Sequence, residues 1–218
     1  MTRPLTRRRS KLAPDPDVRR AIMVAASETI RERGVRGLSI AVVLDRAELS
    51  TRAFYRHFES KDQLVAEIFL EMARAEKRRL RRKMAKATNP VEAVAAWIDG
   101  RLDLAFDETT KSDLRGLSLE AQSQMFASPE LIQPAYAEML KPLVEQLHRG
   151  LADGVFPNID PVTDAQSIHG VVWTSTERQW ATADYERADV RQRTLRFCLR
   201  GLGVTPETIA DITAHDRL

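Results

Sequence analysis

Apolar residues recur every three or four positions through most of this chain, which is the spacing of helices that bury one face. The pattern predicts a first helix that is capped by Asp17 and runs to about Arg33, a second from Ser39 to Ala47, and a third that begins after Ser50. Further helices are expected over 60–86, 91–106, 114–126, 129–153, about 161–181 and 188–202, with a short one after Pro206. We therefore expect an all-α fold of about nine or ten helices.

Residues 39–61, SIAVVLDRAELSTRAFYRHFESK, hold two short helices separated by a very short connection. The hydroxyls of Ser39 and Ser50 each precede a helical segment and can accept a hydrogen bond from its first free N–H groups. Ser50 comes only three residues after Ala47, so the two helices must turn sharply, which is the geometry of a helix-turn-helix.

The second helix of this pair has two different faces. Phe54 and Phe58 lie one turn apart and form an apolar side, because successive residues are rotated by about 100°. The opposite arc carries hydroxyl and guanidinium groups, which are the groups that bind phosphates and base edges in DNA. An ordinary solvated helix face is the alternative, but it does not account for two capped helices joined by so short a turn. The polar arc consists of Thr51, Arg52, Tyr55 and Arg56.

The segment AELSTRAFYRHFESKDQLVAEIF resembles the DNA-binding signature of the tetracycline-repressor (TetR) family of bacterial regulators. The matching features are the pair Phe54-Tyr55, then His57-Phe58, then Ser60-Lys61 at the start of the next helix. The resemblance implies that Thr51 and Arg52 approach base edges and that Ser39 contacts the DNA backbone. It also implies phosphate contacts from Tyr55, His57 and Lys61.

Two positions depart from the family pattern. Glu48 stands where the family usually has a turn glycine, and a residue other than glycine pays a steric cost in a left-handed conformation. Ala41 stands where an arginine that reads bases is common. These departures concern the operator sequence that the protein prefers and not DNA binding itself.

Charge is divided unevenly along the chain. Residues 1–86 contain 22 Lys and Arg against 11 Asp and Glu, a net charge of +11, whereas residues 87–218 contain 12 against 20, a net charge of −8. This split indicates an N-terminal part that binds a polyanion and a C-terminal part that avoids DNA. Residues 1–16 form a basic arm that either adds DNA contacts or is a solubilising tail; its basic residues are Arg3, Arg7, Arg8, Arg9 and Lys11.

We expect three parts: a flexible arm over 1–16, a helix-turn-helix domain over 17–62, and a connecting helix plus C-terminal domain over 63–218. The helices at about 161–181 and 188–202 carry apolar stripes, which suit a four-helix interface in a homodimer. Pro134 and Pro142 should kink or divide the helix that contains them.

The family resemblance places the C-terminal helices around a cavity for a small-molecule effector. Methionine and aromatic side chains there suit a mostly apolar ligand, and Arg101 can pair with a carboxylate or phosphate on it. The alternative is that these residues are ordinary core, with Arg101 paired to Asp103 or another acid. The candidate ligand-binding residues are Trp97, Arg101, Met125, Phe126, Tyr136, Met139 and Trp173.

The sequence lacks the common motifs of catalytic, cofactor-binding and metal-binding sites. It has no phosphate-binding glycine loop, no GxSxG or HExxH motif and no paired cysteines, so we expect no cofactor, no metal site and no enzymatic activity. His169 lies in an apolar stripe and is expected to be an interior or interface histidine with its hydrogen bonds satisfied, and not a ligand contact. No apolar run has the length of a membrane span or follows the basic N-terminus as in a signal peptide, so we place the protein in the cytoplasm.

Together these features favour a homodimeric transcriptional regulator, most simply a repressor that a mostly apolar small molecule releases from a palindromic DNA operator. Two alternatives stay open: a helical ligand-binding protein or enzyme without operator specificity, and an architectural DNA-binding protein without an effector.

Overall fold

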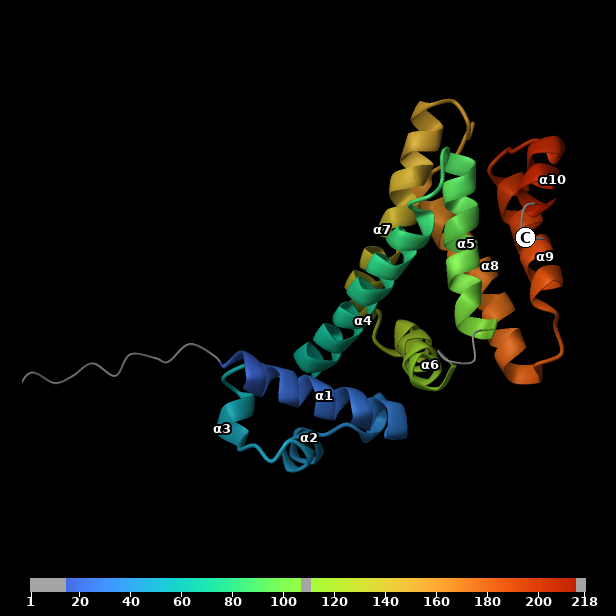
Figure 1. Cartoon of the computed structure of the whole chain (residues 1–218). Coiled ribbons are helices and arrows are strands. Elements are labelled where there is room, and N and C mark those ends of the chain that lie inside the picture. The colour runs from blue at the N-terminus through green and yellow to red at the C-terminus, as the bar shows by residue number, and fades with distance from the viewer. Residues whose placement is uncertain (1–14, 107–110, 215–218) are drawn as a thin grey trace, which may run out of the picture. The chain divides into compact units, whose positions relative to one another are not determined.

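The computed structural model describes residues 15–106 and 111–214, and only the backbone for residues 111–114. The described residues form ten α-helices and one short 3-10 helix, with no strand among them, which confirms the all-α prediction (Figure 1). The helices are α1 (Pro16–Arg33), η1 (Val35–Gly37), α2 (Ile40–Arg46), α3 (Thr51–Phe54), α4 (Lys61–Met84), α5 (Pro90–Phe106), α6 (Lys111–Ala127), α7 (Pro129–Ala152), α8 (Pro161–Thr182), α9 (Arg187–Gly201) and α10 (Pro206–Ala214).

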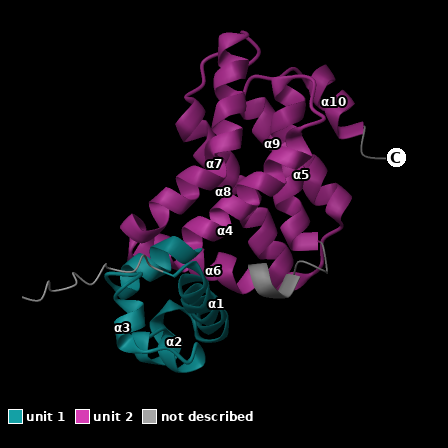
Figure 2. Ribbon diagram, turned by 60° about the vertical axis from the view of Figure 1, so that its left-hand side comes forward, with its two compact units in different colours: residues 1–68 teal, residues 69–218 magenta. Residues whose placement is uncertain are grey.

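The chain divides into two compact units, Met1–Ile68 and Phe69–Leu218 (Figure 2). The division falls inside α4, so this helix begins in the first unit and ends in the second. The basic residues predicted to form an N-terminal arm lie before residue 15, outside the described part of the chain.

The first unit is built on a small apolar core. Ile22 and Ile30 of α1 meet Val43 of α2, and Phe54 and Phe58 complete the core, all of them at most 2% exposed. The rings of Phe54 and Phe58 lie 5.7 Å apart, centroid to centroid. Because both aromatic residues face inward, the polar arc between them faces outward.

The first helix begins earlier than the sequence suggested. Asp15, not Asp17, caps α1: its Oδ1 accepts a hydrogen bond of 2.9 Å from the backbone N–H of Asp17. Pro16 then occupies the first helical position, where its missing N–H costs nothing and its fixed φ suits the helix. The prediction of Asp17 as the cap was therefore wrong by half a turn.

The second unit is arranged around α5, which is apolar on nearly all sides. Trp97, Ile98 and Leu102 of this helix are fully buried, and α5 packs against α6, α7, α8 and α9. Helix α7 continues through both Pro134 and Pro142 and is not divided. Contacts with α5, α6 and α8 support α7 along its length, so the loss of two backbone hydrogen bonds does not end it.

In the described ranges, 15–106 and 111–214, no helix is both long enough and apolar enough to span a membrane.

Candidate DNA-binding surface and ligand cavity

Two serine caps fix the start of α2 and of α3. The Ser39 hydroxyl accepts a hydrogen bond from the N–H of Val42 at 3.2 Å, and the Ser50 hydroxyl accepts one from the N–H of Ala53 at 3.4 Å. Both caps were predicted, and both are confirmed. They set the two helix axes on either side of a connection of only a few residues, as a helix-turn-helix requires.

Glu48 lies in this connection with a φ of +53°, so the expectation of a left-handed residue here is confirmed. The next N–H, that of Leu49, donates to the carbonyl of Leu44 at 2.9 Å and closes the end of α2. A glycine would adopt this conformation without the steric cost that a Cβ atom brings. The turn is therefore held by the fold although its residue is unfavourable.

Helix α3 is shorter than a regular recognition helix, since it ends at Phe54. The chain nevertheless continues to turn: the N–H groups of His57 and Phe58 both donate to the carbonyl of Phe54, at 2.8 and 3.0 Å. This extra turn is what buries Phe58 below Phe54 and leaves Tyr55 58% exposed beside them.

The structure brings the predicted DNA-binding residues to one short segment and to the helix ends next to it. His57 and Lys61 are partly buried, and the Nδ1 atom of His57 has no hydrogen-bond partner in the described part of the chain. Lys61 is the first residue of α4, behind a cap in which the Ser60 hydroxyl accepts from the N–H of Gln63 at 3.1 Å. Contact with DNA stays a prediction for all seven residues. The exposed ones are Ser39, Thr51, Arg52, Tyr55 and Arg56.

Ion pairs connect α1 with the helices that carry these residues. Arg46 at the end of α2 lies 2.6 Å from Glu32, and Arg19 lies 2.9 Å from Glu67 at the start of α4. The hydrogen bond from Arg46 lowers the pKa of the Glu32 carboxyl below its usual range. Helix α1 thus acts as the support on which α2 and the first turns of α4 are positioned.

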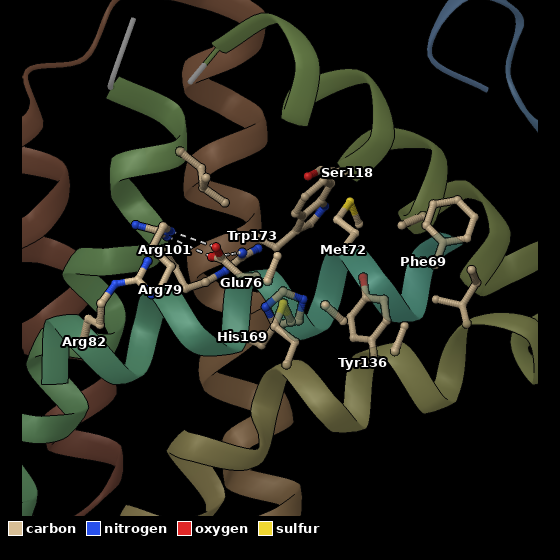
Figure 3. Close-up of a pocket in the computed structure, with 17 residues that line it drawn as sticks. Phe69, Met72, Glu76, Arg79, Arg82, Arg101, Ser118, Tyr136, His169 and Trp173 are labelled. Atoms are coloured by element: carbon tan, nitrogen blue, oxygen red, sulfur yellow. Dashed lines mark hydrogen bonds and ion pairs between the residues drawn. The ribbon is translucent and has the colours of Figure 1, made fainter. Parts of the chain in front are cut away.

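The second unit contains a cavity of about 310 Å³ between α4, α5, α6, α7 and α8 (Figure 3). Its wall is mainly apolar, with Phe69 and Met72 from α4, Ile132 and Met139 from α7, and Trp173 from α8. This size lies at the lower end of the range of small-molecule sites, about 300–1,000 Å³.

Four of the seven candidate ligand residues line this cavity, and three do not. Trp97 is fully buried next to it, with its ring 6.4 Å from that of His169. Met125 lies one helical turn beyond the α6 residues that line the cavity, and Phe126, rotated further round the helix, is 83% exposed. The four that line it are Arg101, Tyr136, Met139 and Trp173.

Sequence reasoning missed the contribution of α4 to this wall. Phe69, Met72 and Glu76 were assigned to a connecting helix, yet their side chains face the cavity. Their spacing of three and four residues was a visible signal, since it places all three on one face of α4. What the sequence lacked was any sign of which helices that face meets.

A buried polar cluster closes one end of the cavity. Nη1 of Arg101 donates to Oε1 of Glu76 at 2.7 Å, and Arg79 donates two hydrogen bonds of 2.8 Å to the same carboxylate. Burial of Glu76 raises the pKa of its carboxyl, but the hydrogen bond from Arg79 and the charges of Arg101 and Arg79 outweigh burial, and the net pKa is lowered. The partner of Arg101 is therefore Glu76.

Asp103, the partner considered from the sequence, belongs to a neighbouring set of ion pairs. Its carboxylate lies 2.7 Å from Nζ of Lys83 and 2.9 Å from Nη2 of Arg187. These contacts join the end of α4 and the start of α9 to α5.

His169 lies in the cavity wall and is only 7% exposed. Neither Nδ1 nor Nε2 of its ring has a hydrogen-bond partner among the described residues, so the expected satisfied histidine was wrong on that point. Burial and the nearby charge of Arg101 lower the pKa of the imidazole to about 3, which makes the ring neutral at physiological pH.

The outer surface of α8 and α9 exposes apolar side chains. Val162 is 52% exposed and Phe197 is 67% exposed. A Cβ atom added at Gly170 or Gly201 would meet nothing within 4 Å, so both glycines lie on open surface.

In the part of the chain that the structure describes, no three His, Cys, Asp or Glu side chains lie close enough together to bind a metal ion. Cys198 is buried, and burial raises the pKa of its thiol to about 12. A thiol with such a pKa is a poor nucleophile and a poor metal ligand at neutral pH.

Comparison with known proteins finds a family match within the first unit. Residues 22–68 match the bacterial regulatory proteins of the tetR family. Over 200 residues the chain is 22% identical to the HTH-type transcriptional repressor KstR2 of Mycolicibacterium smegmatis, a match that covers 88% of this chain and 96% of the repressor. This relative is thus a transcriptional repressor of about the same length as the chain.

Solved structures share the fold at low identity. RolR in complex with resorcinol superimposes with a TM-score of 0.63 and 19% identity, covering 93% of this chain and 94% of RolR. The regulator FadR of Bacillus subtilis in complex with stearoyl-CoA gives a TM-score of 0.66 and 19% identity, covering 84% and 98%. The matching DNA-binding unit and this fold together support a regulator of the tetR family of bacterial transcriptional regulators.

Proposed function

We propose that this protein is a homodimeric repressor that binds a palindromic DNA operator and leaves it when a mostly apolar small molecule fills the cavity of the second unit. The single observation that carries the proposal is the course of α4, which begins with Lys61 directly after the exposed turn and ends in the wall of the cavity. Residues 17–62 are assigned to DNA binding, and residues 63–218 to effector binding and dimerisation.

The proposed DNA contacts come from polar groups of the first unit that are exposed or partly buried. Thr51 and Arg52, at the start of α3, are proposed to reach base edges in the major groove, as the N-terminal residues of recognition helices do. Phosphate contacts fix the register without reading sequence. They are assigned to Ser39, Tyr55, Arg56, His57 and Lys61.

The second unit supplies the dimer contact. Members of this family bind operators as dimers, and the exposed Val162 and Phe197 with the open glycines Gly170 and Gly201 support an interface through α8 and α9. Small residues let two helices approach closely, and the apolar side chains gain by leaving water. A two-fold axis then presents two recognition segments to successive major grooves, about 34–36 Å apart.

Release by the effector follows from its different affinity for two arrangements of the dimer. Because α4 is continuous with the DNA-binding unit, a ligand that packs against Phe69 and Met72 favours one position of this helix. If that position does not match the groove spacing, the ligand lowers the affinity for DNA, and bound DNA lowers the affinity for the ligand by the same factor.

The known ligands of proteins with this fold differ widely, from resorcinol in RolR to stearoyl-CoA in FadR. A cavity of about 310 Å³ favours a compact molecule over a long acyl thioester in this protein.

A mobility-shift assay on the DNA upstream of the gene, repeated with a panel of lipophilic compounds, tests the proposal. Sequence-specific binding that one compound reverses is the expected result. Binding that is independent of sequence and that no compound changes would favour the architectural alternative, and no binding at all would reject a DNA-binding role.

A further inference from the structure

The imidazole of His169 is the least satisfied polar group of the cavity wall. It projects from α8 among the lining side chains, beside Tyr136 (Figure 3). Both of its nitrogens are buried and lack a hydrogen-bond partner in residues 15–106 and 111–214. A buried polar group without a partner is costly, so a ligand that supplies one gains affinity and selectivity.

The side chains around His169 do not meet this need. The rings of Trp97 and Tyr136 approach the imidazole edge to face, with centroids at 6.4 and 5.2 Å. The Tyr136 hydroxyl donates to Oε1 of Gln122, and Nη1 of Arg101 donates to Glu76. The Tyr136 hydroxyl and this nitrogen of Arg101 thus donate to other residues, and the imidazole ring forms part of the cavity wall.

The chemistry of a matching ligand follows from the neutral state of the ring. A neutral imidazole has one donor nitrogen and one acceptor nitrogen. A hydroxyl group both donates and accepts, so it can bond to either nitrogen whichever of them carries the proton. The Nε atom of Arg101 is a further buried donor without a partner in the described chain, and the same hydroxyl oxygen can accept from a donor of this kind.

A carboxylate suits this site less well than a hydroxyl. The charge of Arg101 is already compensated by Glu76 at 2.7 Å, and most of the remaining wall is apolar, with Leu104 and Ile132 among its residues. Arg79 and Arg82 also line the cavity, but Arg79 bonds to the same Glu76, and the exposed Arg82 lies on the far side of Arg79 from His169 (Figure 3). A carboxylate placed beside His169 would therefore lose its hydration without meeting a cation that lacks a counter-charge, which is unfavourable in a buried site.

We propose that the cavity takes a compact apolar molecule with a neutral hydroxyl group, of a phenol or an alcohol, that hydrogen-bonds to the His169 ring. This assignment rests on the proposed function of the cavity as the effector site. It makes His169 the residue that selects among apolar compounds of similar size.

The test uses probes that differ in one group: 4-propylphenol, 4-propylanisole, propylbenzene and 4-propylbenzoate. Their affinities for the full chain, without DNA, are measured by calorimetry on the wild type and on His169→Phe. His148→Phe is the matched control, because His148 is an exposed histidine of α7 that does not line the cavity. Thermal unfolding is measured for each variant, to check that it is folded.

The phenol is expected to bind the wild type about tenfold or more tightly than the other three probes, because only the phenol gives the ring both a donor and an acceptor. His169→Phe should remove this preference, and His148→Phe should keep it. The inference is overturned if propylbenzene binds as tightly as the phenol, or if 4-propylbenzoate binds best and loses affinity in Arg101→Met. It is equally overturned if no probe binds the wild type below about 1 mM.

A separate mobility-shift measurement distinguishes this inference from the proposed function. A phenol that binds through His169 but leaves the DNA complex intact would refute release by the effector while the ligand assignment stands. Release of DNA by a compound whose affinity is the same in His169→Phe would refute the ligand assignment alone.

Discussion

Nη1 of Arg101 on α5 lies 2.7 Å from Oε1 of Glu76 on α4, and this buried pair joins the helix that leads to the DNA-binding unit to the centre of the second unit. Both side chains are at most 11% exposed, and both line the cavity. A ligand bound in the cavity therefore lies next to the ion pair that holds α4 against α5.

Glu76→Gln should destabilise the second unit by about 3 kcal/mol, because it leaves the buried guanidinium of Arg101 without its counter-ion. Urea unfolding followed by circular dichroism measures the change. Glu145→Gln is the control: Glu145 pairs with Arg81 at 2.8 Å on the surface, where both side chains are about half exposed, and such pairs contribute less than about 1 kcal/mol. Equal losses in the two variants would contradict the importance of the buried pair.

The same carboxylate predicts an acid-sensitive contribution to stability. Since the folded-state pKa of Glu76 is lowered from 4.5, the unfolded chain binds this proton more tightly than the folded chain. The contribution is complete above the ordinary pKa and is lost as the pH falls through the folded value. The stability difference between wild type and Glu76→Gln should therefore shrink below about pH 4.5. A difference that stays constant down to pH 3 would argue against it.

Tyr55→Phe combined with Lys61→Ala should weaken binding to all DNA sequences. Loss of one lysine contact to phosphate should reduce the slope of log affinity against log salt by about 1. Fluorescence anisotropy at several salt concentrations measures the slope. Lys141→Ala, which removes an exposed lysine of α7, should leave it unchanged; an unaltered slope in the double variant would remove the phosphate contact.

Arg52→Ala should relax sequence preference. A guanidinium that bonds to a base edge contributes about 1–3 kcal/mol of discrimination, whereas a phosphate contact contributes none. Competition between operator and scrambled DNA measures the ratio of affinities. Arg36→Ala, at an exposed position of η1, is the control. If Arg52→Ala lowers the affinity for operator and for scrambled DNA equally, Arg52 contacts the DNA backbone and not a base.

Glu48→Gly should stabilise the first unit by roughly 0.5–1 kcal/mol, since relief of the left-handed strain exceeds the entropy that glycine adds to the unfolded chain. Glu48→Ala is the control, because it removes the same charge and keeps the Cβ atom. Thermal unfolding of the two variants separates these effects. Equal shifts would show that charge and not backbone conformation matters at this turn.

Phe197→Glu should dissociate the proposed dimer, because it places a charge where an apolar ring would leave water. Phe126→Glu offers a control of the same chemistry, as Phe126 is even more exposed but belongs to α6 and not to α8 or α9. Analytical ultracentrifugation measures the mass of each. A dimer that survives Phe197→Glu, or one that Phe126→Glu alone disrupts, would move the interface to another surface.

Local features of the chain were readable from its sequence because they depend on neighbouring residues. Hydroxyl caps at Ser39 and Ser50, the inward pair Phe54 and Phe58, and the left-handed Glu48 each follow from spacing, from a side chain that bonds to nearby backbone, or from the family pattern. The all-α class followed from one repeated period. The cap of α1 was misplaced because Asp15 and Asp17 flank Pro16 and only the position of the proline at the first turn decides between them.

Only the tertiary structure decided which helix faces meet. It brought Glu76 of α4 to Arg101 of α5, and it placed Tyr136, His169 and Trp173 from two other helices around one space. Helical periodicity says that a face is buried but not against what, so Phe126 and Tyr136 were equal candidates in the sequence. Packing separated them, since α6 turns Phe126 outward while α7 turns Tyr136 into the cavity.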